Sequence, residues 1–142
     1  MSLSTSPFRT FMETGVGAIG FKVFIAEVPE DKQIKVTNGL FTPFFAIYFG
    51  GPIRAAGDHH LVDSAKDSTI VYCTIEAYAP RAAEALEMKN RVITSLTGKR
   101  PPDCGQLTLE GGMTYSRATN EVRPTMYVES TVFSSRSNLS WD

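Results

Sequence analysis

The sequence is poor in cysteine, has almost no excess of charge of either sign, and contains no long apolar run. Its 142 residues include two cysteines, Cys73 and Cys104, too few for the paired-cysteine spacings of zinc sites. We interpret both as reduced thiols of a protein made in a cytoplasm. Fourteen basic and fifteen acidic residues leave a net charge of −1, which argues against a protein that holds nucleic acid by its phosphates. The longest apolar run, residues 44–49, is far shorter than the ~18 residues of a membrane span.

The length and composition are those of one globular domain. With 42% apolar and 20% charged residues the chain can bury its own core, so we expect residues 1–142 to form a single domain. Apolar residues recur with periods of 2 and 3.6 along the chain, which are typical of strands and helices, respectively. We predict helices over 7–14 and 80–97, and strands over 21–28, 44–49, 68–79, 106–109, 113–116 and 125–134.

This order of elements predicts an α+β fold: a single mixed or antiparallel β-sheet, with one main helix packed across a face and a short N-terminal helix. Gly15 and Gly17 are expected to end the first helix. Gly111 and Gly112 favour a hairpin between the two short strands. A long loop over 50–67 and a frayed C-terminal tail over 135–142 complete the prediction.

Side-chain alternation predicts which side of the sheet the main helix covers. In the strand over 68–79, one side is small and apolar, formed by Val71, Cys73, Ile75 and Ala77. The helical stripe expected to pack on that side is formed by Ala82, Leu86, Ile93 and Leu96, with Ala85, Lys89 and Val92 beside it. On the wet side of the helix, Glu87 and Arg91 have the spacing of an ion pair.

The chain has a surplus of aromatic residues, and several are expected on the uncovered side of the sheet. One amphipathic helix covers one side only, so the other side would be an apolar patch that favours self-association. The aromatic residues assigned to that side are Phe24, Tyr48, Tyr72, Tyr78, Tyr127 and Phe133.

The loop over 50–67 holds the one cluster of metal-ligating residue types, which consists of Asp58, His59, His60 and Asp63. Such a set is compatible with a divalent metal, and hence with a small metal-dependent hydrolase. If the two histidines lay on a strand, they would point to opposite faces and could not easily reach one ion. A solvated loop is the simpler interpretation, and we expect no metal.

We find no set of residues that predicts catalysis or a cofactor. Cys73 lies mid-strand on the expected core side, and no helix start is placed to activate Cys104. The glycines of 15–20 spell GVGAIG, but no strand precedes them as a dinucleotide-binding turn requires. We therefore expect a protein that is not an enzyme and has no cofactor.

Four segments resemble the tail terminator proteins of long, non-contractile-tailed bacteriophages, particularly those of actinobacterial phages. They are VFIAEVPE at 23–30, PFFAIYFGGP at 43–52, the strand–helix passage at 69–96, and the run at 124–133 that contains YVES and ends in VF. The likeness covers about residues 21–133 and consists of general sequence patterns rather than a catalytic signature. The segment 31–42 and the histidine-containing loop depart from the family pattern.

The resemblance implies a structural role in the virion. Such proteins form a ring, typically of six subunits, on the last ring of the tail-tube protein. The ring halts tube polymerisation and presents the surface that joins the head through a head-completion or connector protein. DNA passes through the lumen without specific binding. The implied location is the tail–neck junction of the virion, after assembly in the host cytoplasm and without a membrane.

Contacts between subunits, or with the tail tube, are expected from the long loop and the last strand. The loop is polar and carries charges of alternating sign, whereas the strand turns side chains away from the expected core. The candidate interface residues are Arg54, Asp58, His59, His60, Asp63, Lys66, Tyr127, Glu129 and Phe133. Other hypotheses are another neck or tail component (a head-completion or tail-tube subunit), the hydrolase above, or a ligand-binding domain that uses the open sheet side.

Overall fold

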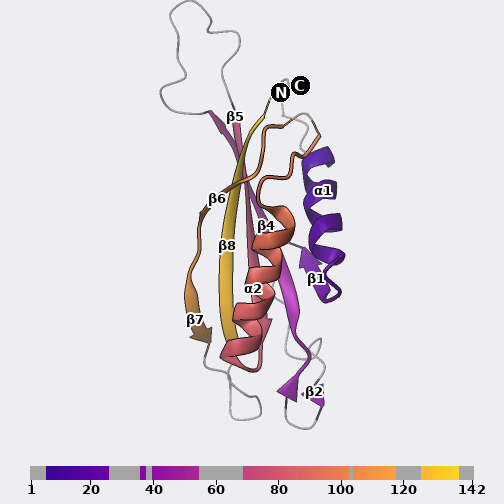
Figure 1. The fold of residues 1–142 in the computed structure, drawn as a ribbon, viewed down its shortest axis with the longest axis vertical. Helices are drawn as coiled ribbons and strands as arrows, with labels where there is room; N and C mark the ends of the chain where they lie inside the picture. The colour runs from indigo at the N-terminus through magenta and orange to yellow at the C-terminus, as the bar shows by residue number, and fades with distance from the viewer. Residues whose placement is uncertain are drawn as a thin grey trace, which may run out of the picture.

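A computed structural model describes residues 6–25, 36–37, 40–54, 69–102, 104–117 and 126–137. It contains two helices and a single large sheet, which confirms the predicted α+β fold (Figure 1). The elements, in chain order, are α1 (Ser6–Gly17), β1 (Lys22–Ile25), β2 (Val36–Thr37), β3 (Leu40–Phe41), β4 (Phe44–Arg54), β5 (Thr69–Ala79), α2 (Ala82–Leu96), β6 (Thr108–Gly111), β7 (Thr114–Arg117) and β8 (Met126–Ser137).

The large sheet has the strand order β1-β4-β5-β8-β6, and β7 also pairs with β8. The β1–β4 pair is parallel, and the other described pairs in this sheet are antiparallel. The three long strands β4, β5 and β8 form its centre and run along the length of the molecule (Figure 1). β2 and β3 form a separate two-stranded sheet within the segment 31–42.

Both helices pack on one side of the large sheet, which we call the helix side; the opposite side is the far side. The predicted apolar row of β5 is on the helix side and belongs to the main core, together with Phe45 and Ile47 of β4. From α1 the main core receives Phe8, Met12 and Val16. The prediction that Gly15 ends this helix is wrong. α1 continues to Gly17, and Gly15 within it lies close to α2: a Cβ there would lie 2.8 Å from Leu96 Cδ2.

The predicted apolar stripe of α2 is also wrong in part. The side chains that α2 buries are Ala85, Met88, Val92 and Leu96, whereas Leu86 is 49% exposed. Apolar residues lie on more than one face of α2, so the sequence pattern does not determine which face packs on the sheet. Contact with the sheet selects the flank with Met88. The predicted pair on the wet side is present, with Arg91 Nη2 donating to Glu87 Oε1 at 2.9 Å.

The far side of the sheet carries a second apolar cluster. Phe44 and Tyr78 stack with ring centroids 4.8 Å apart, and Phe24 and Tyr48 pack against the same cluster. β4 is therefore buried on both sides, as its apolar run predicts. Phe44 and Tyr78 are both buried, so this part of the far side is core and not the exposed aromatic patch that we expected.

Two strands are longer than predicted. β4 runs through the glycine pair to Arg54, with a register shift between Gly50 and Ile53, so the first part of the expected loop is strand. β8 runs to Ser137, so residues 135–137 of the expected tail are strand, and residues 138–142 lie outside the described residues. Ser135 is buried in this strand and its hydroxyl donates to the Gly105 carbonyl at 2.8 Å. Within the described ranges, neither helix has the length and apolar character needed to cross a membrane.

The predicted hairpin between β6 and β7 is wrong. Instead, the two strands pair one after the other along β8, with Leu109 opposite Phe133 and Tyr115 opposite Val128. Between them, Ser130 N donates to the Met113 carbonyl at 2.8 Å. Gly112 and Met113 connect β6 to β7 along the edge of β8, and we call this connection the crossing. It is not a tight turn: the backbone of Gly112 lies so close to β8 that a Cβ there would be 2.1 Å from the Ser130 carbonyl oxygen.

The corrected helix orientation predicts unequal losses at two leucines of α2. Leu96→Ala should lower the free energy of unfolding by about 2–5 kcal/mol, because it removes a buried side chain that also contacts α1. Leu86→Ala should change it by less than ~1 kcal/mol, because that side chain is half exposed. Urea denaturation of both variants measures the difference. A larger loss at Leu86 would show that the face of α2 predicted from the sequence, which contains Leu86, packs on the sheet.

The crossing at Gly112 gives a second prediction. Gly112→Ala should cost about 1–3 kcal/mol, because the added methyl group meets backbone that cannot move aside easily. Gly17→Ala is the matched control: nothing lies within 4 Å of its Cβ position, and alanine in a helix should stabilise by up to about 1 kcal/mol. Thermal unfolding of both variants provides the comparison. Equal effects would show that Gly112 is not held against β8.

Candidate assembly surfaces

The predicted interface residues of the long loop fall largely outside the described part of the chain. Arg54 is the last residue of β4 and lies opposite Thr69 of β5. Asp58, His59, His60, Asp63 and Lys66 lie outside the described residues. Their predicted role in contacts between subunits stays a prediction.

The predicted interface residues of the last strand are described, and their side of the sheet differs from the prediction. Tyr127, Glu129 and Phe133 do alternate with their neighbours, but they lie on the helix side. The cause is the register with β5, which places Phe133 opposite Cys73 and Glu129 opposite Ala77. Directly opposed residues in an antiparallel pair share a side. Phe133 is fully buried in the main core, so it cannot be an interface residue of the folded subunit.

Glu129 is buried as well, and it has an internal partner. Lys89 of α2 places Nζ 3.4 Å from Glu129 Oε1, and the two side chains are only 19% and 6% exposed. The ion pair ties α2 to β8 at a polar site, next to Gly112 at the crossing. Glu129 thus contributes to the packing of the subunit. Of the three predicted residues in this strand, Tyr127 alone remains at the surface, 37% exposed.

The large sheet has two open edges. β1 forms one edge, while β6 and β7 form the other along β8 (Figure 1). Within the described residues, neither edge has a partner strand on its outer side. Unpaired edges leave backbone N–H and C=O groups available to another chain. These two edges are therefore candidate assembly surfaces.

Exposed apolar side chains concentrate near the β6–β7 edge. Of the described large hydrophobic residues that are exposed, Leu109 lies on β6, Met113 lies in the crossing, and Tyr127 lies on β8 beside β7. Leu86 lies on α2, which packs over β5 and β8, and Met113 is the most exposed at 66%. The fifth, Ile25, is on the opposite edge, at the end of β1. Apolar surface is thus available on both edges.

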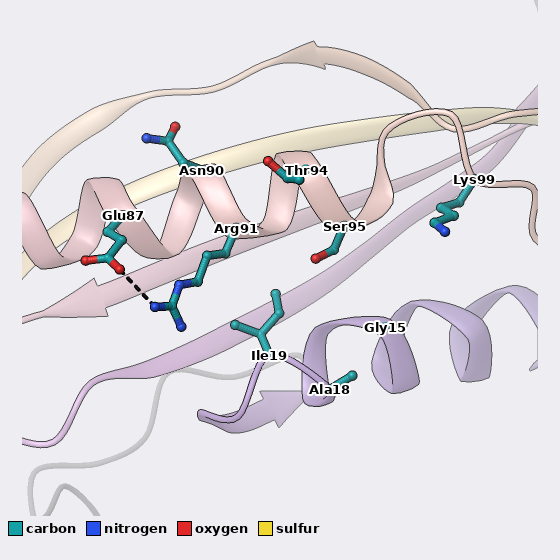
Figure 2. Close-up of a pocket in the computed structure, with 9 residues that line it drawn as sticks. All are labelled: Gly15, Ala18, Ile19, Glu87, Asn90, Arg91, Thr94, Ser95 and Lys99. Atoms are coloured by element: carbon teal, nitrogen blue, oxygen red, sulfur yellow. Dashed lines mark hydrogen bonds and ion pairs between the residues drawn. The ribbon is translucent and has the colours of Figure 1, made fainter.

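A groove of about 840 Å³ lies between α2 and the end of α1 (Figure 2). It continues into a second hollow of about 720 Å³, which shares Gly15, Ser95 and Lys99 with it. In Figure 2, Arg91 reaches along the helix to Glu87, so these two charges are partners of opposite sign. The described lining residues include neither cysteine nor histidine: they are Gly15, Ala18, Ile19, Glu87, Asn90, Arg91, Thr94, Ser95 and Lys99.

Both thiols are buried, and the surroundings of Cys73 do not activate it. Burial raises the pKa of the Cys73 thiol, and the Glu13 carboxylate raises it further, so the group is protonated at neutral pH. Cys104 is buried as well. Among the described residues, no three or more metal-ligating side chains come together in a way that could hold an ion. The cluster of Asp58, His59, His60 and Asp63 lies outside that range.

The Lys89–Glu129 pair predicts an effect on folding rather than on assembly. Lys89→Met should cost about 1–3 kcal/mol, because it leaves the Glu129 carboxylate buried beside an apolar chain. Arg91→Met is the control, since it breaks an exposed pair and should cost less than ~0.5 kcal/mol. Chemical denaturation of the two variants measures both values. Similar small losses would mean that Glu129 is solvated.

Sequence reasoning missed the edge that β6 and β7 form together, because it assigned Gly111 and Gly112 to a turn. The available signal was the glycine pair itself, which also marks bulges and close backbone approach. The Lys89–Glu129 pair joins residues 40 positions apart, and no local pattern indicates it. No family model matches the chain, and a search of curated proteins gives no match either.

Proposed function

We propose that the protein is a structural subunit that forms a ring on the phage tail tube, stops polymerisation of the tube, and provides the surface for joining the head. The observation that carries the proposal is the pair of open sheet edges on opposite flanks of the subunit. Two different surfaces that bind each other make a head-to-tail contact, and such contacts close into rings when the rotation between copies allows it.

The distribution of apolar surface supports the same proposal. Exposed apolar residues lie on both flanks: Leu109, Met113 and Tyr127 near one edge, and Ile25 on the other. Side chains of this kind are enriched at interfaces, and a contact between unlike edges would cover both groups at once. The buried thiols and the Glu87–Arg91 pair in the groove also suit a subunit whose role is assembly rather than catalysis.

The charge of the chain is compatible with DNA passing through such a ring. A net charge of −1 lacks the excess of positive charge by which proteins hold phosphates, so a passing polyanion would meet no strong attraction. The proposed partners are other copies of the chain, typically six in the ring, the tail-tube protein and a head-completion or connector protein. The proposed location is the tail–neck junction of the virion.

Imaging and polymerisation assays test this proposal directly. Purified protein should form closed rings with a central hole in negative-stain images, with a mass by light scattering that is a whole multiple of the subunit. When the protein is added to polymerising tail-tube protein at about one ring per tube end, elongation of the tubes should stop. Open tubes of the protein alone would indicate a tail-tube subunit instead. A monomer at every concentration, with no effect on tube length, would refute the proposal.

Substitution at the apolar edge gives a matched prediction. Met113→Lys should leave the subunit folded but weaken ring formation, because it places a charge in the crossing, where the side chain is most exposed. Asn90→Lys adds the same charge to an exposed position of α2 and should leave ring formation unchanged. Light scattering across a dilution series measures assembly, and circular dichroism checks folding. Equal behaviour of the two variants would remove Met113 from the interface.

A further inference from the structure

The two open edges run in opposite directions. β1 is parallel to β4, and each step from β4 to β5, from β5 to β8, and from β8 to β6 reverses the direction. β6 and β7 therefore run antiparallel to β1 within one subunit. When two copies stand side by side in the same orientation, β1 of one copy meets the β6–β7 edge of the next as an antiparallel strand. The antiparallel arrangement is slightly more stable per residue than the parallel one.

The side chains of β1 are already sorted between the two sides of the sheet. Val23 packs against the main core on the helix side, whereas Phe24 packs against the far-side cluster. Alternation then places Lys22 on the far side and Ile25 on the helix side. Lys22 is exposed, with its Nζ 5.3 Å from the centre of the Phe24 ring.

The side chains of β6 are sorted in the same way. Leu109 lies opposite Phe133 and is therefore on the helix side, while Thr108 lies opposite Ser134 on the far side. The Glu110 carboxylate accepts a hydrogen bond from the Ser134 hydroxyl, which places Glu110 on the far side too. All four residues of this strand are exposed.

For the sheet to continue from one copy to the next, helix-side residues of β1 must lie opposite helix-side residues of β6, and far-side residues opposite far-side residues. One register meets this requirement and also matches charge: Val23 opposite Leu109, Lys22 opposite Glu110, and Phe24 opposite Thr108. A shift of one residue would place apolar and polar side chains on the wrong sides. A shift of two residues keeps the sides but separates the two charges. The charge-matched register pairs residues 22–24 with residues 108–110 and ends before Leu107, because the Leu107 N–H and C=O are already bonded to the Lys99 carbonyl and the Gly98 N–H.

We infer that neighbouring copies join by antiparallel pairing of β1 with β6, in the register that places Lys22 of one copy opposite Glu110 of the next. This inference rests on the proposed ring and specifies its contact. The occupant of each edge is a second copy of this chain. The apolar pair forms on the helix side and the ion pair on the far side, so the contact selects both orientation and register.

Charge exchange tests the contact. Lys22→Glu and Glu110→Lys should each raise the subunit concentration at half assembly by roughly fivefold to tenfold at low salt, because each sets like charges opposite one another. The double variant restores opposite charges and should return to within about threefold of the parent protein. Mass photometry over a dilution series gives these concentrations, and 0.5 M salt should shrink the differences.

The control exchanges two charges that lie off both edges. Glu87 and Arg91 pair within α2, so Glu87→Lys and Arg91→Glu make the same changes in net charge as the edge variants. Assembly of these control variants should match that of the parent protein. If the edge variants behave like the controls while the parent forms rings, the strand pairing is wrong and the proposed function stands. If the parent forms no ring, the proposed function itself fails.

Disulfide cross-linking tests the register independently. Val23→Cys combined with Leu109→Cys should join neighbouring copies into a ladder of covalent oligomers under mild oxidation, since directly opposed residues have the Cα separation that a disulfide needs. Ile25→Cys combined with Leu109→Cys places the thiols diagonally and should cross-link at most weakly. The native thiols are buried and should not contribute. Equal cross-linking of the two variants, or cross-linking of the second alone, would overturn the register.

Discussion

The pairing of β5 with β8 is the interaction on which the rest of the structure depends. Every residue of β5, from Thr69 to Ala79, lies opposite a residue of β8. Because opposed residues share a side, this register decides which side chains of β8 lie beneath α2. It places Phe133 in the core and brings Glu129 within reach of Lys89. It also leaves the other flank of β8 free, and β6 and β7 fill that flank in succession.

Small residues allow both helices to lie on one side of the sheet. Ala77 and Ala79 of β5 and Ala85 of α2 all belong to the main core, and their small side chains leave room for α2 to pack on the strands. Gly15 does the same between the helices, where a Cβ would collide with Leu96. Both helices lie on one side of the sheet, and its two edges are formed by different strands: β1 at one end, and β6 with β7 at the other. The fold therefore has a built-in direction, which the proposed head-to-tail assembly requires.

Open edges are a hazard for a soluble protein, and these two show features that restrict their use. The described part of β1 has four residues, and Lys22 lies at its start. The opposite edge carries Glu110 and is interrupted at Gly112, where the chain lies against the Ser130 carbonyl. Short, charged and irregular edges disfavour indiscriminate pairing. In the proposed contact, a short edge of matching length and charge still fits, and this selectivity would favour a closed ring over open-ended aggregation.

The sequence by itself determined the features that local periodicity controls. The apolar row of β5, the position of α2, the burial of β4 on both sides and the Glu87–Arg91 pair all follow from spacings within one segment. The α+β class follows from the order of those segments. On the candidate surfaces, local pattern indicated that side chains alternate in the last strand and that Tyr127 is on the surface.

Only the tertiary structure decided how those segments are placed against one another. A period shows that a strand has two sides, but it does not show which side meets a helix. The side of β8 that carries Glu129 and Thr131 looks solvent-exposed in the sequence, yet its register with β5 and its pairing with Lys89 make it an inner side. Leu86 and Met88 are equally plausible core residues until α2 contacts the sheet. Gly111 and Gly112 suit a turn or a crossing, and the backbone of β8 selects the crossing, because its hydrogen-bonding groups are satisfied there by both short strands.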